Sequence, residues 1–216
     1  MSVVSRPLAG GVTYVKVRNL QESTAPDLDR VLATAARART RAMILDLRNN
    51  PGGLLTAAVE VAERFLEAGQ LVTYTEGRLR NQNLRFSAHA RKAYTAMPMV
   101  ALVNQGSAAG AEIIAGALQD WRRASLVGAP TFGRGSIQTI IPLGEGSGLR
   151  LTTARWFTPK GRQVHSKGLT PDQPVEGRGI PPLTPGMTEE EWLARDVQLR
   201  SALARLGPPT EPQAGR

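Results

Sequence analysis

The sequence predicts an α/β fold in which helices cover a mostly parallel sheet. Two short and almost uninterrupted apolar runs, 42–47 and 99–104, have the composition of strands that are buried on both faces. Each run leads into a polar turn and then into a segment with apolar residues at helical spacing, 54–69 and 108–121. Alternation of strand, turn and helix is typical of α/β domains, so we expect these strands to share one sheet.

The flanking segments extend this pattern. The run 11–17 has the β-branched and aromatic composition of a strand, and the helix after it is predicted to have Thr24 as its cap. Two strand-like runs within 136–161 enclose the turn GEGSG and predict an antiparallel hairpin. Thr188 and Glu191 have the spacing of a capping box, which predicts one final helix reaching beyond residue 200.

Length and composition are those of an ordinary globular protein. The chain has 216 residues, of which 41% are hydrophobic and 21% charged, and we expect one core domain over 1–206 and a flexible tail over 207–216. No apolar run approaches the roughly 18 residues that a membrane span needs, and no export signal follows Met1. Without cysteine, disulfides and thiolate chemistry are excluded.

The net charge of +9 favours acidic partners. Cations are densest in 77–94, which contains no acidic residue. A nucleic-acid surface would need aromatic residues among these cations, and only Phe86 and Tyr94 are available. A solvated basic loop or hairpin is therefore the favoured interpretation, and nucleic-acid binding the weaker one.

Three polar turns, 48–53, 104–108 and 130–138, follow apolar runs. Ligands of α/β folds bind at the carboxyl ends of the strands, so we expect these turns to converge. Ser107 is predicted to cap a helix that begins at Ala108, and it could act as a nucleophile only with a base in reach. The two histidines of the chain, His89 and His165, belong to no motif that would supply that base.

The other two turns have their own chemistry. The consecutive glycines of RNNPGG, 48–53, can expose amide hydrogens to a developing oxyanion, although a simple tight turn before a helix explains them equally well. Arg134 lies between two glycines, with Gln138 four residues later. A guanidinium can bind an anion but cannot act as a general base, because it stays protonated.

Taken together, the segments resemble the C-terminal processing peptidases, also called tail-specific proteases. The resemblance runs in order from about residue 10 to 205. The segments that carry it are GVTYVKV, ILDLRNNPGGLL, VNQGSAAGAEIIAGALQD, RASLVGAPTFGRGSIQ, LTTARWFTPKGR, KGLTPD and DVQLRSALARL. The resemblance implies a crotonase-like (ClpP/crotonase-type) α/β core, no cofactor and no metal, and a serine and lysine dyad supported by a glutamine.

The resemblance also assigns positions to the catalytic groups. Its nucleophile motif, G-(S/T)-A-S-A-(S/A)-E-I, places the reactive serine at Ala109, and its T-(F/Y)-G-K-G turn places the base at Arg134. Gln138 matches the supporting glutamine. The oxyanion donors match Gly52 or Gly53, together with Gly110.

Both reactive groups of the dyad are therefore replaced. A methyl group cannot attack a carbonyl, and an arginine cannot take a proton from a serine. We expect a catalytically impaired homologue or an engineered inactive variant of a C-terminal processing peptidase. The alternatives are a peptide-tail-binding pseudopeptidase and, more remotely, a basic nucleic-acid-binding module.

Partners and location follow from the same resemblance. The expected partners are peptide or protein C-terminal tails, bound without a metal or a membrane span. The family's PDZ domain is expected to be absent from this chain. Such peptidases usually work outside the cytoplasm, so a periplasmic or cell-envelope location is expected.

Overall fold

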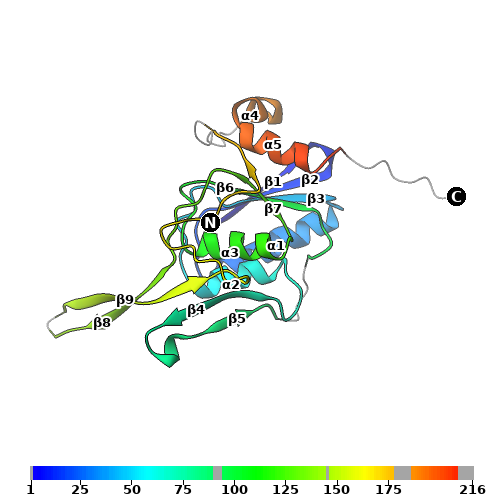
Figure 1. Cartoon of the computed structure of the whole chain (residues 1–216). Helices are drawn as coiled ribbons and strands as arrows, with labels where there is room; N and C mark the ends of the chain where they lie inside the picture. Colours follow the sequence, from blue (N-terminus) through cyan, green and yellow to red (C-terminus); the bar gives the residue numbers. More distant parts are fainter. Residues whose placement is uncertain (1, 90–93, 145, 178–185, 209–216) are drawn as a thin grey trace.

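The computed structural model describes residues 2–89, 94–144, 146–177 and 186–208. Its main element is a sheet with the strand order β1-β2-β3-β6-β7-β10 (Figure 1). The strands are β1 (Val3–Leu8), β2 (Val12–Val17), β3 (Ala42–Asp46), β6 (Met99–Val103), β7 (Ser125–Gly128) and β10 (Gln173–Pro174). All neighbours pair in parallel except β1, which pairs antiparallel with β2, so the predicted mostly parallel sheet is confirmed.

A smaller antiparallel sheet has the order β5-β4-β9-β8. Its strands are β4 (Leu71–Gly77), β5 (Arg85–Ser87), β8 (Ser136–Pro142) and β9 (Gly148–Phe157). The hairpin predicted within 136–161 is confirmed as β8 and β9, and its far end projects from the body of the molecule (Figure 1). Strand β8 lies at the edge of this sheet, so one side of its backbone has no neighbouring strand in the described structure.

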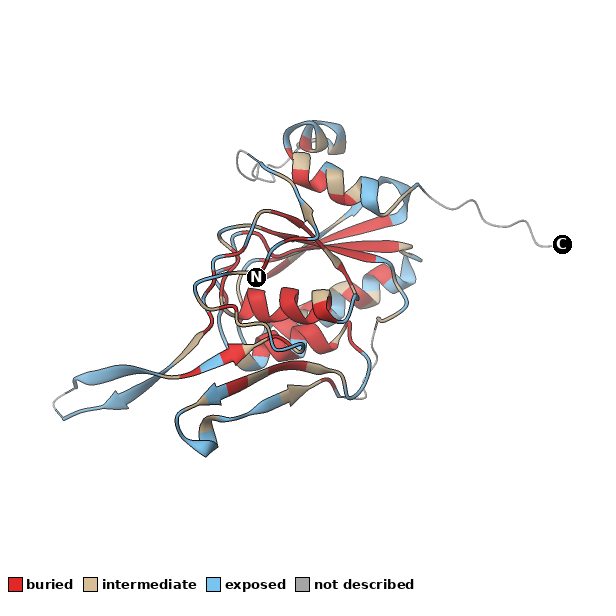
Figure 2. Ribbon diagram, viewed as in Figure 1, coloured by how far each residue is buried: buried red, intermediate tan, exposed pale blue. Residues whose placement is uncertain are grey.

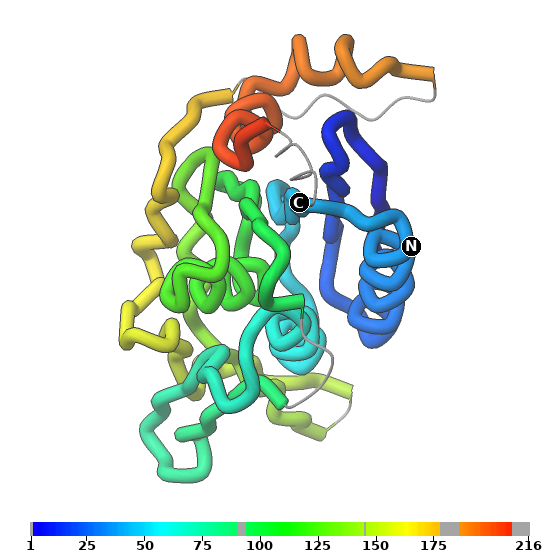
Figure 3. The backbone as a smooth tube through the Cα atoms, turned by 90° about the vertical axis from the view of Figure 1, so that its right-hand side faces the viewer, coloured from blue at the N-terminus to red at the C-terminus, as the bar shows by residue number. Residues whose placement is uncertain are grey.

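Helices cover both faces of the large sheet. On one face lie α1 (Thr24–Arg37), α2 (Leu55–Glu63) and α3 (Gly110–Asp120), of which α2 and α3 also pack against the small sheet. The opposite face is covered by α4 (Glu189–Arg195) and α5 (Val197–Arg205) (Figures 1 and 3). Each face has its own apolar core. Trp156 joins the core beneath α2 and α3, and Trp192 lies fully buried in the core beneath α5. Buried residues concentrate in the large sheet and in α2 and α3, whereas the projecting hairpin is exposed (Figure 2).

Two predicted helix boundaries are wrong. Thr24 is the first residue of α1 and not its cap, and its hydroxyl accepts a hydrogen bond from the Gln21 amide at 2.9 Å. The final helix is two helices, because Asp196 leaves helical geometry at φ −106° and ψ 86° and caps α5 through the Leu199 amide. The capping box of Thr188 and Glu191 is confirmed at the start of α4.

In the described residues, no helix has the length and apolar character needed to cross a bilayer. Residues 209–216 of the expected tail lie outside the described residues. The crotonase-type relationship stays a prediction.

Candidate active site

The three polar turns meet at the carboxyl ends of β3, β6 and β7. The Ala108 amide donates to the Asn50 carbonyl at 2.9 Å, and the Phe132 amide donates to the Ser107 carbonyl at 3.0 Å. These bonds join the second turn to the first and the third. The structure therefore shows the convergence expected from the rule for α/β folds.

Ser107 is neither a helix cap nor an accessible nucleophile. Helix α3 begins at Gly110, and the Ser107 hydroxyl donates to the Leu47 carbonyl at 2.9 Å and accepts from the Asn104 amide at 3.0 Å. The side chain is fully buried. The predicted cap is wrong, because the serine binds the end of a neighbouring strand and not the amides of its own helix.

Ala109 precedes α3 in a backbone conformation that alanine rarely adopts, with φ 49° and ψ −113°. A residue in such a region costs about 1–3 kcal/mol and persists only where its surroundings impose it. Here the Ala109 amide donates to the Glu112 carboxylate at 2.9 Å, and the preceding residue is bonded to the first turn. A strained residue between a strand and a helix is how several hydrolases expose a nucleophile.

Glu112 is the residue that fixes this geometry. Its carboxylate is fully buried, and each oxygen accepts two hydrogen bonds. Oε1 accepts from the Thr131 hydroxyl at 2.5 Å and the Gly133 amide at 2.7 Å, and Oε2 accepts from the amides of Ala109 and Arg134 at 2.9 and 2.8 Å. One side chain therefore ties the start of α3 to the third turn.

The glycines near Ala109 differ in what their amides do. The Gly52 amide donates to the Asn50 side-chain oxygen at 2.8 Å, so it is not free for a ligand. The amides of Gly53 and Gly110 donate to no other described residue. Space is also restricted, since a Cβ on Gly53 would lie 2.0 Å from the Leu20 carbonyl oxygen.

Ala109 opens onto a small apolar cavity of about 190 Å³. Its walls are mostly apolar, and the only side-chain hydroxyl among them is that of Ser136. The lining residues are Gly53, Leu55, Ala109, Gly110, Ile113, Ser136, Ile137 and Trp156. The two glycines with free amides therefore line the same cavity as Ala109.

Arg134 and Gln138 line a second and larger cavity of about 560 Å³. Ser136 lines both cavities, so the two adjoin at this residue. The Gln138 side-chain oxygen accepts a hydrogen bond from Arg150, and the Arg134 guanidinium lies 4.8 Å from the centre of the Phe132 ring. The predicted site residues are therefore divided between two adjacent cavities, with Ala109, Gly53 and Gly110 in one and Arg134 and Gln138 in the other.

Comparison with known proteins gives the family of this chain. The model of peptidase family S41 matches residues 11–175. The chain belongs to peptidase family S41. The carboxy-terminal-processing protease of Bartonella bacilliformis is 42% identical over 180 residues, covering 82% of this chain and 41% of that protein. The carboxyl-terminal-processing protease of Synechocystis is 41% identical over 172 residues, covering 80% of this chain and 39% of that protein.

A solved S41-like fold agrees with these relatives. The photosystem II D1 C-terminal processing protease matches with a TM-score of 0.75 and 29% identity, covering 84% of this chain and 50% of that one. The chain thus spans about two fifths of the curated relatives named above and half of this structure. The resemblance predicted from the sequence is confirmed at the level of the family, and the roles of single residues stay predictions.

This S41 chain also contains a buried ionic network that the sequence analysis missed. Arg48 is fully buried between Asp46, at the end of β3, and Asp196, at the start of α5, with Nη2 to carboxylate distances of 2.7 and 2.8 Å. Lys16 adds a second cation at 3.1 Å from Asp46. The network joins the first turn to the C-terminal helices.

The network shifts the pKa values of its members. Burial by itself would raise the pKa of Asp46, but the charges of Arg48 and Lys16 and the hydrogen bonds to it outweigh burial and lower the pKa below 3.8. Burial has the opposite effect on a cation, so it lowers the pKa of Lys16, and the charge of Asp46 opposes that shift without cancelling it. Burial, followed by the charge of Asp46, raises the pKa of Tyr14, whose hydroxyl donates to Asp46 at 2.7 Å. The charges and hydrogen-bonding groups of the network are paired with one another, which is typical of a structural network.

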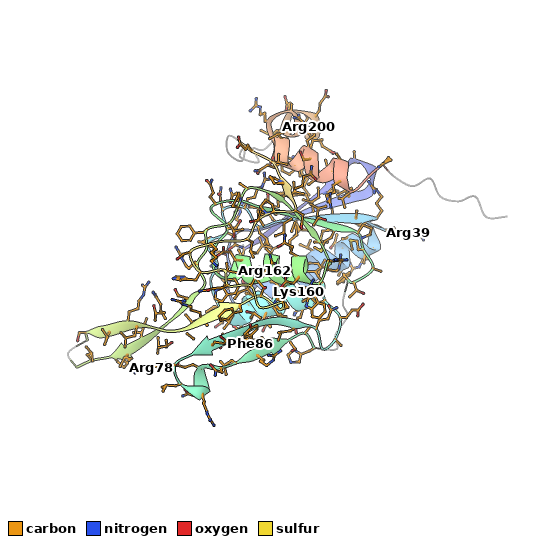
Figure 4. The ribbon with its side chains drawn as sticks, in the orientation of Figure 1. Arg39, Arg78, Phe86, Lys160, Arg162 and Arg200 are labelled. Carbon is orange, nitrogen blue, oxygen red and sulfur yellow. The ribbon has the colours of Figure 1, made fainter. Side chains whose placement is uncertain are left out.

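The basic segment 77–94 is a hairpin in the part that is described. Strands β4 and β5 pair antiparallel, and both aromatic residues of the segment, Phe86 and Tyr94, pack against the core. Neither is free to stack on bases. Cations outside this segment lie in separate regions, as Arg39 and Arg200 show in Figure 4. The nucleic-acid hypothesis therefore gains no support.

No group of three or more metal-ligating side chains occurs within the described ranges.

Proposed function

We propose that this chain is the core of a C-terminal processing type of S41 peptidase that binds peptide segments but does not hydrolyse them. The observation that carries the proposal is Ala109. It occupies the strained position before α3, beside two free amides, with a methyl group where the family's motif has a reactive hydroxyl.

The amides of Gly53 and Gly110 support the idea of a retained oxyanion site. Both residues line the cavity that Ala109 faces, and their N–H groups have no partner among the described residues. Donors of this kind stabilise a developing oxyanion when they lie about 2.7–3.1 Å from it. Without a nucleophile, they can only bind the carbonyl oxygen of a peptide.

Arg134 is the second half of the argument. By the family motif it occupies the place of the lysine base, and an arginine stays protonated at any useful pH. Neither an attacking oxygen nor a group that would activate it is then present. The rate that an oxyanion site alone can sustain is small beside that of an intact dyad.

Peptide binding has two structural supports. Strand β8 is an edge strand next to both cavities, and an extended peptide can add to such an edge through backbone hydrogen bonds. The apolar cavity between Leu55, Ile113 and Trp156 can take a nonpolar side chain of that peptide. Tails of proteins are the ligands that the family resemblance favours, and the same resemblance favours a location outside the cytoplasm.

The test compares four proteins on one fluorogenic peptide with a nonpolar tail. The unaltered chain and a Ser136→Ala variant are expected to show no turnover, whereas the Ala109→Ser, Arg134→Lys double variant is expected to cleave. The single Ala109→Ser variant is the matched control, since it restores the hydroxyl without the base. Turnover by the unaltered chain would overturn the proposal, and its loss in Ser136→Ala would assign the nucleophile to the only hydroxyl of the apolar cavity.

A further inference from the structure

The larger of the two cavities is strongly basic. It has a volume of about 560 Å³ and is lined by Phe132, Gly133, Arg134, Ser136, Gln138, Arg150, His165 and Ser166. Two guanidinium groups face this space from different elements, the third turn and β9, and no carboxylate lines it. Such a cavity repels cations and attracts an anionic group.

Most donors of these two arginines are unused within the described structure. The Arg134 side chain donates no hydrogen bond there and only stacks on Phe132, at 4.8 Å from the ring centre. Arg150 donates through Nε to Gln138, which leaves its two terminal nitrogens free. Both residues are exposed, so water can occupy these donors until an anion displaces it.

The carboxylate that binds the third turn does not neutralise this pair. Glu112 lies behind the third turn, and its two oxygens already accept four hydrogen bonds, including one from the Arg134 amide. Its carboxylate is fully buried, so it is closed to both guanidinium groups. The Gln138 oxygen meanwhile accepts from Arg150, which orients that guanidinium toward the cavity that both residues line.

The position of the basic cavity determines which anion fits. It adjoins the apolar cavity at Ser136, beside the free amides of Gly53 and Gly110. A peptide whose last residue is apolar can place that side chain among Leu55, Ile113 and Trp156. Its terminal carboxylate can then point past Ser136, the residue that lines both cavities, toward the side of the basic groups. Arginine forks match the geometry of a carboxylate.

We propose that the Arg134 and Arg150 cavity binds the terminal carboxylate of a peptide that ends in an apolar residue. This inference rests on the proposed peptide-binding function and goes beyond it, because it names the end of the chain as the feature recognised. The site then selects free C-termini over internal segments. A peptide bound in this way resembles the product of a cleavage, which has a free C-terminus, more than an uncleaved substrate.

The test measures fluorescence anisotropy with one decapeptide ending in Leu-Val, labelled at its N-terminus, as the free acid and as the C-terminal amide. The unaltered chain is expected to bind the acid about tenfold or more tightly than the amide, because a charged hydrogen-bonded pair is lost in the amide. Arg150→Gln and Arg134→Gln are each expected to weaken binding of the acid to about the level of the amide.

The matched control is Arg155→Gln. Arg155 is an exposed cation on the same strand as Arg150, and it lines neither cavity. Its replacement removes the same charge and is expected to leave the ratio of acid to amide affinity unchanged. An equal loss in Arg155→Gln would reduce the effect to general electrostatics and overturn the proposal.

Two further outcomes separate this inference from the proposed function. Equal binding of acid and amide overturns the carboxylate site but leaves peptide binding intact, whereas no binding of either peptide removes both proposals. Inorganic phosphate serves as the competing anion. Displacement of the acid only at millimolar phosphate supports a carboxylate site, and displacement at micromolar phosphate would assign the cavity to phosphate instead.

Discussion

Replacement of Glu112 by glutamine tests whether one buried carboxylate holds the candidate site together. The change keeps the shape of the side chain but turns one acceptor into an NH₂ donor. If the NH₂ takes the place of Oε2, it faces two amide donors, those of Ala109 and Arg134. If it takes the place of Oε1, it faces the Gly133 amide and the Thr131 hydroxyl.

The second arrangement costs less, because the Thr131 oxygen can accept a hydrogen bond. The Gly133 amide is then left without a partner, which costs about 1–3 kcal/mol. The bonds to the other oxygen lose their ionic partner, which weakens each by about 1 kcal/mol. Burial of a neutral amide costs less than burial of a carboxylate, so we expect a net loss of about 3 kcal/mol in the free energy of unfolding.

Urea unfolding followed by circular dichroism measures this loss. For a protein of this size, about 3 kcal/mol corresponds to a decrease of roughly 6–12 °C in the melting temperature. Glu190→Gln is the control, since Glu190 is exposed on α4 and its replacement is expected to change stability by less than about 0.5 kcal/mol. A Glu112→Gln variant as stable as this control would refute the reasoning, because the four bonds would then contribute nothing.

Three further predictions concern the ionic network and the strained turn. Arg48→Met leaves Asp46 and Asp196 buried without their shared cation, so the free energy of unfolding is expected to fall by about 3–5 kcal/mol in urea titrations; an unchanged midpoint would contradict this. The pKa of Asp46 is lowered in the folded state, so its contribution to stability is present above about pH 4 and is lost as the pH falls through the folded pKa. Unfolding midpoints measured from pH 7 to pH 2 should therefore decrease mainly below pH 4, and less steeply in Asp46→Asn. Ala109→Gly relieves the strain of the positive φ and is expected to stabilise the protein by about 1 kcal/mol. The control Ala36→Gly, on the exposed face of α1, should destabilise it by about 0.5–1 kcal/mol. A loss of stability in both variants would argue against strain at Ala109.

The strands and helices that the sequence predicted are those whose signal is local. The apolar runs that became β3 and β6 are buried over their whole length, and their composition alone indicates this. Strand β1 was missed because its burial alternates over six residues that include a proline, and β10 has only two residues. Such short or edge strands are defined by their neighbours.

The errors at the site have a tertiary cause as well. A serine before a helix is a frequent cap, but Ser107 is bonded to Leu47, 60 residues earlier in the chain. The break at Asp196 likewise depends on Arg48, which lies 148 residues away. Glu112 could have been noticed in the sequence, since it is the only charged side chain of α3 before the last residue of the helix, Asp120. A carboxylate in such a place needs donors, and these can come only from other segments.

The bonds that shape the candidate site use backbone groups at positions 109 and 134, so the framework does not depend on which side chains stand there. The conformation of Ala109 is imposed by the Glu112 carboxylate and by backbone hydrogen bonds between the preceding residues and the adjoining turns, and none of these bonds uses the side chain at position 109. Arg134 is fixed in the same way, through its backbone amide to Glu112 and its carbonyl, which accepts from the Trp156 indole at 3.0 Å. Replacement of a serine or a lysine at these positions therefore removes no contact on which the turns depend. Under the proposed assignment, catalysis would rest on the side chains at positions 109 and 134, whereas the architecture rests on backbone groups bound to a buried glutamate, so the two are separable.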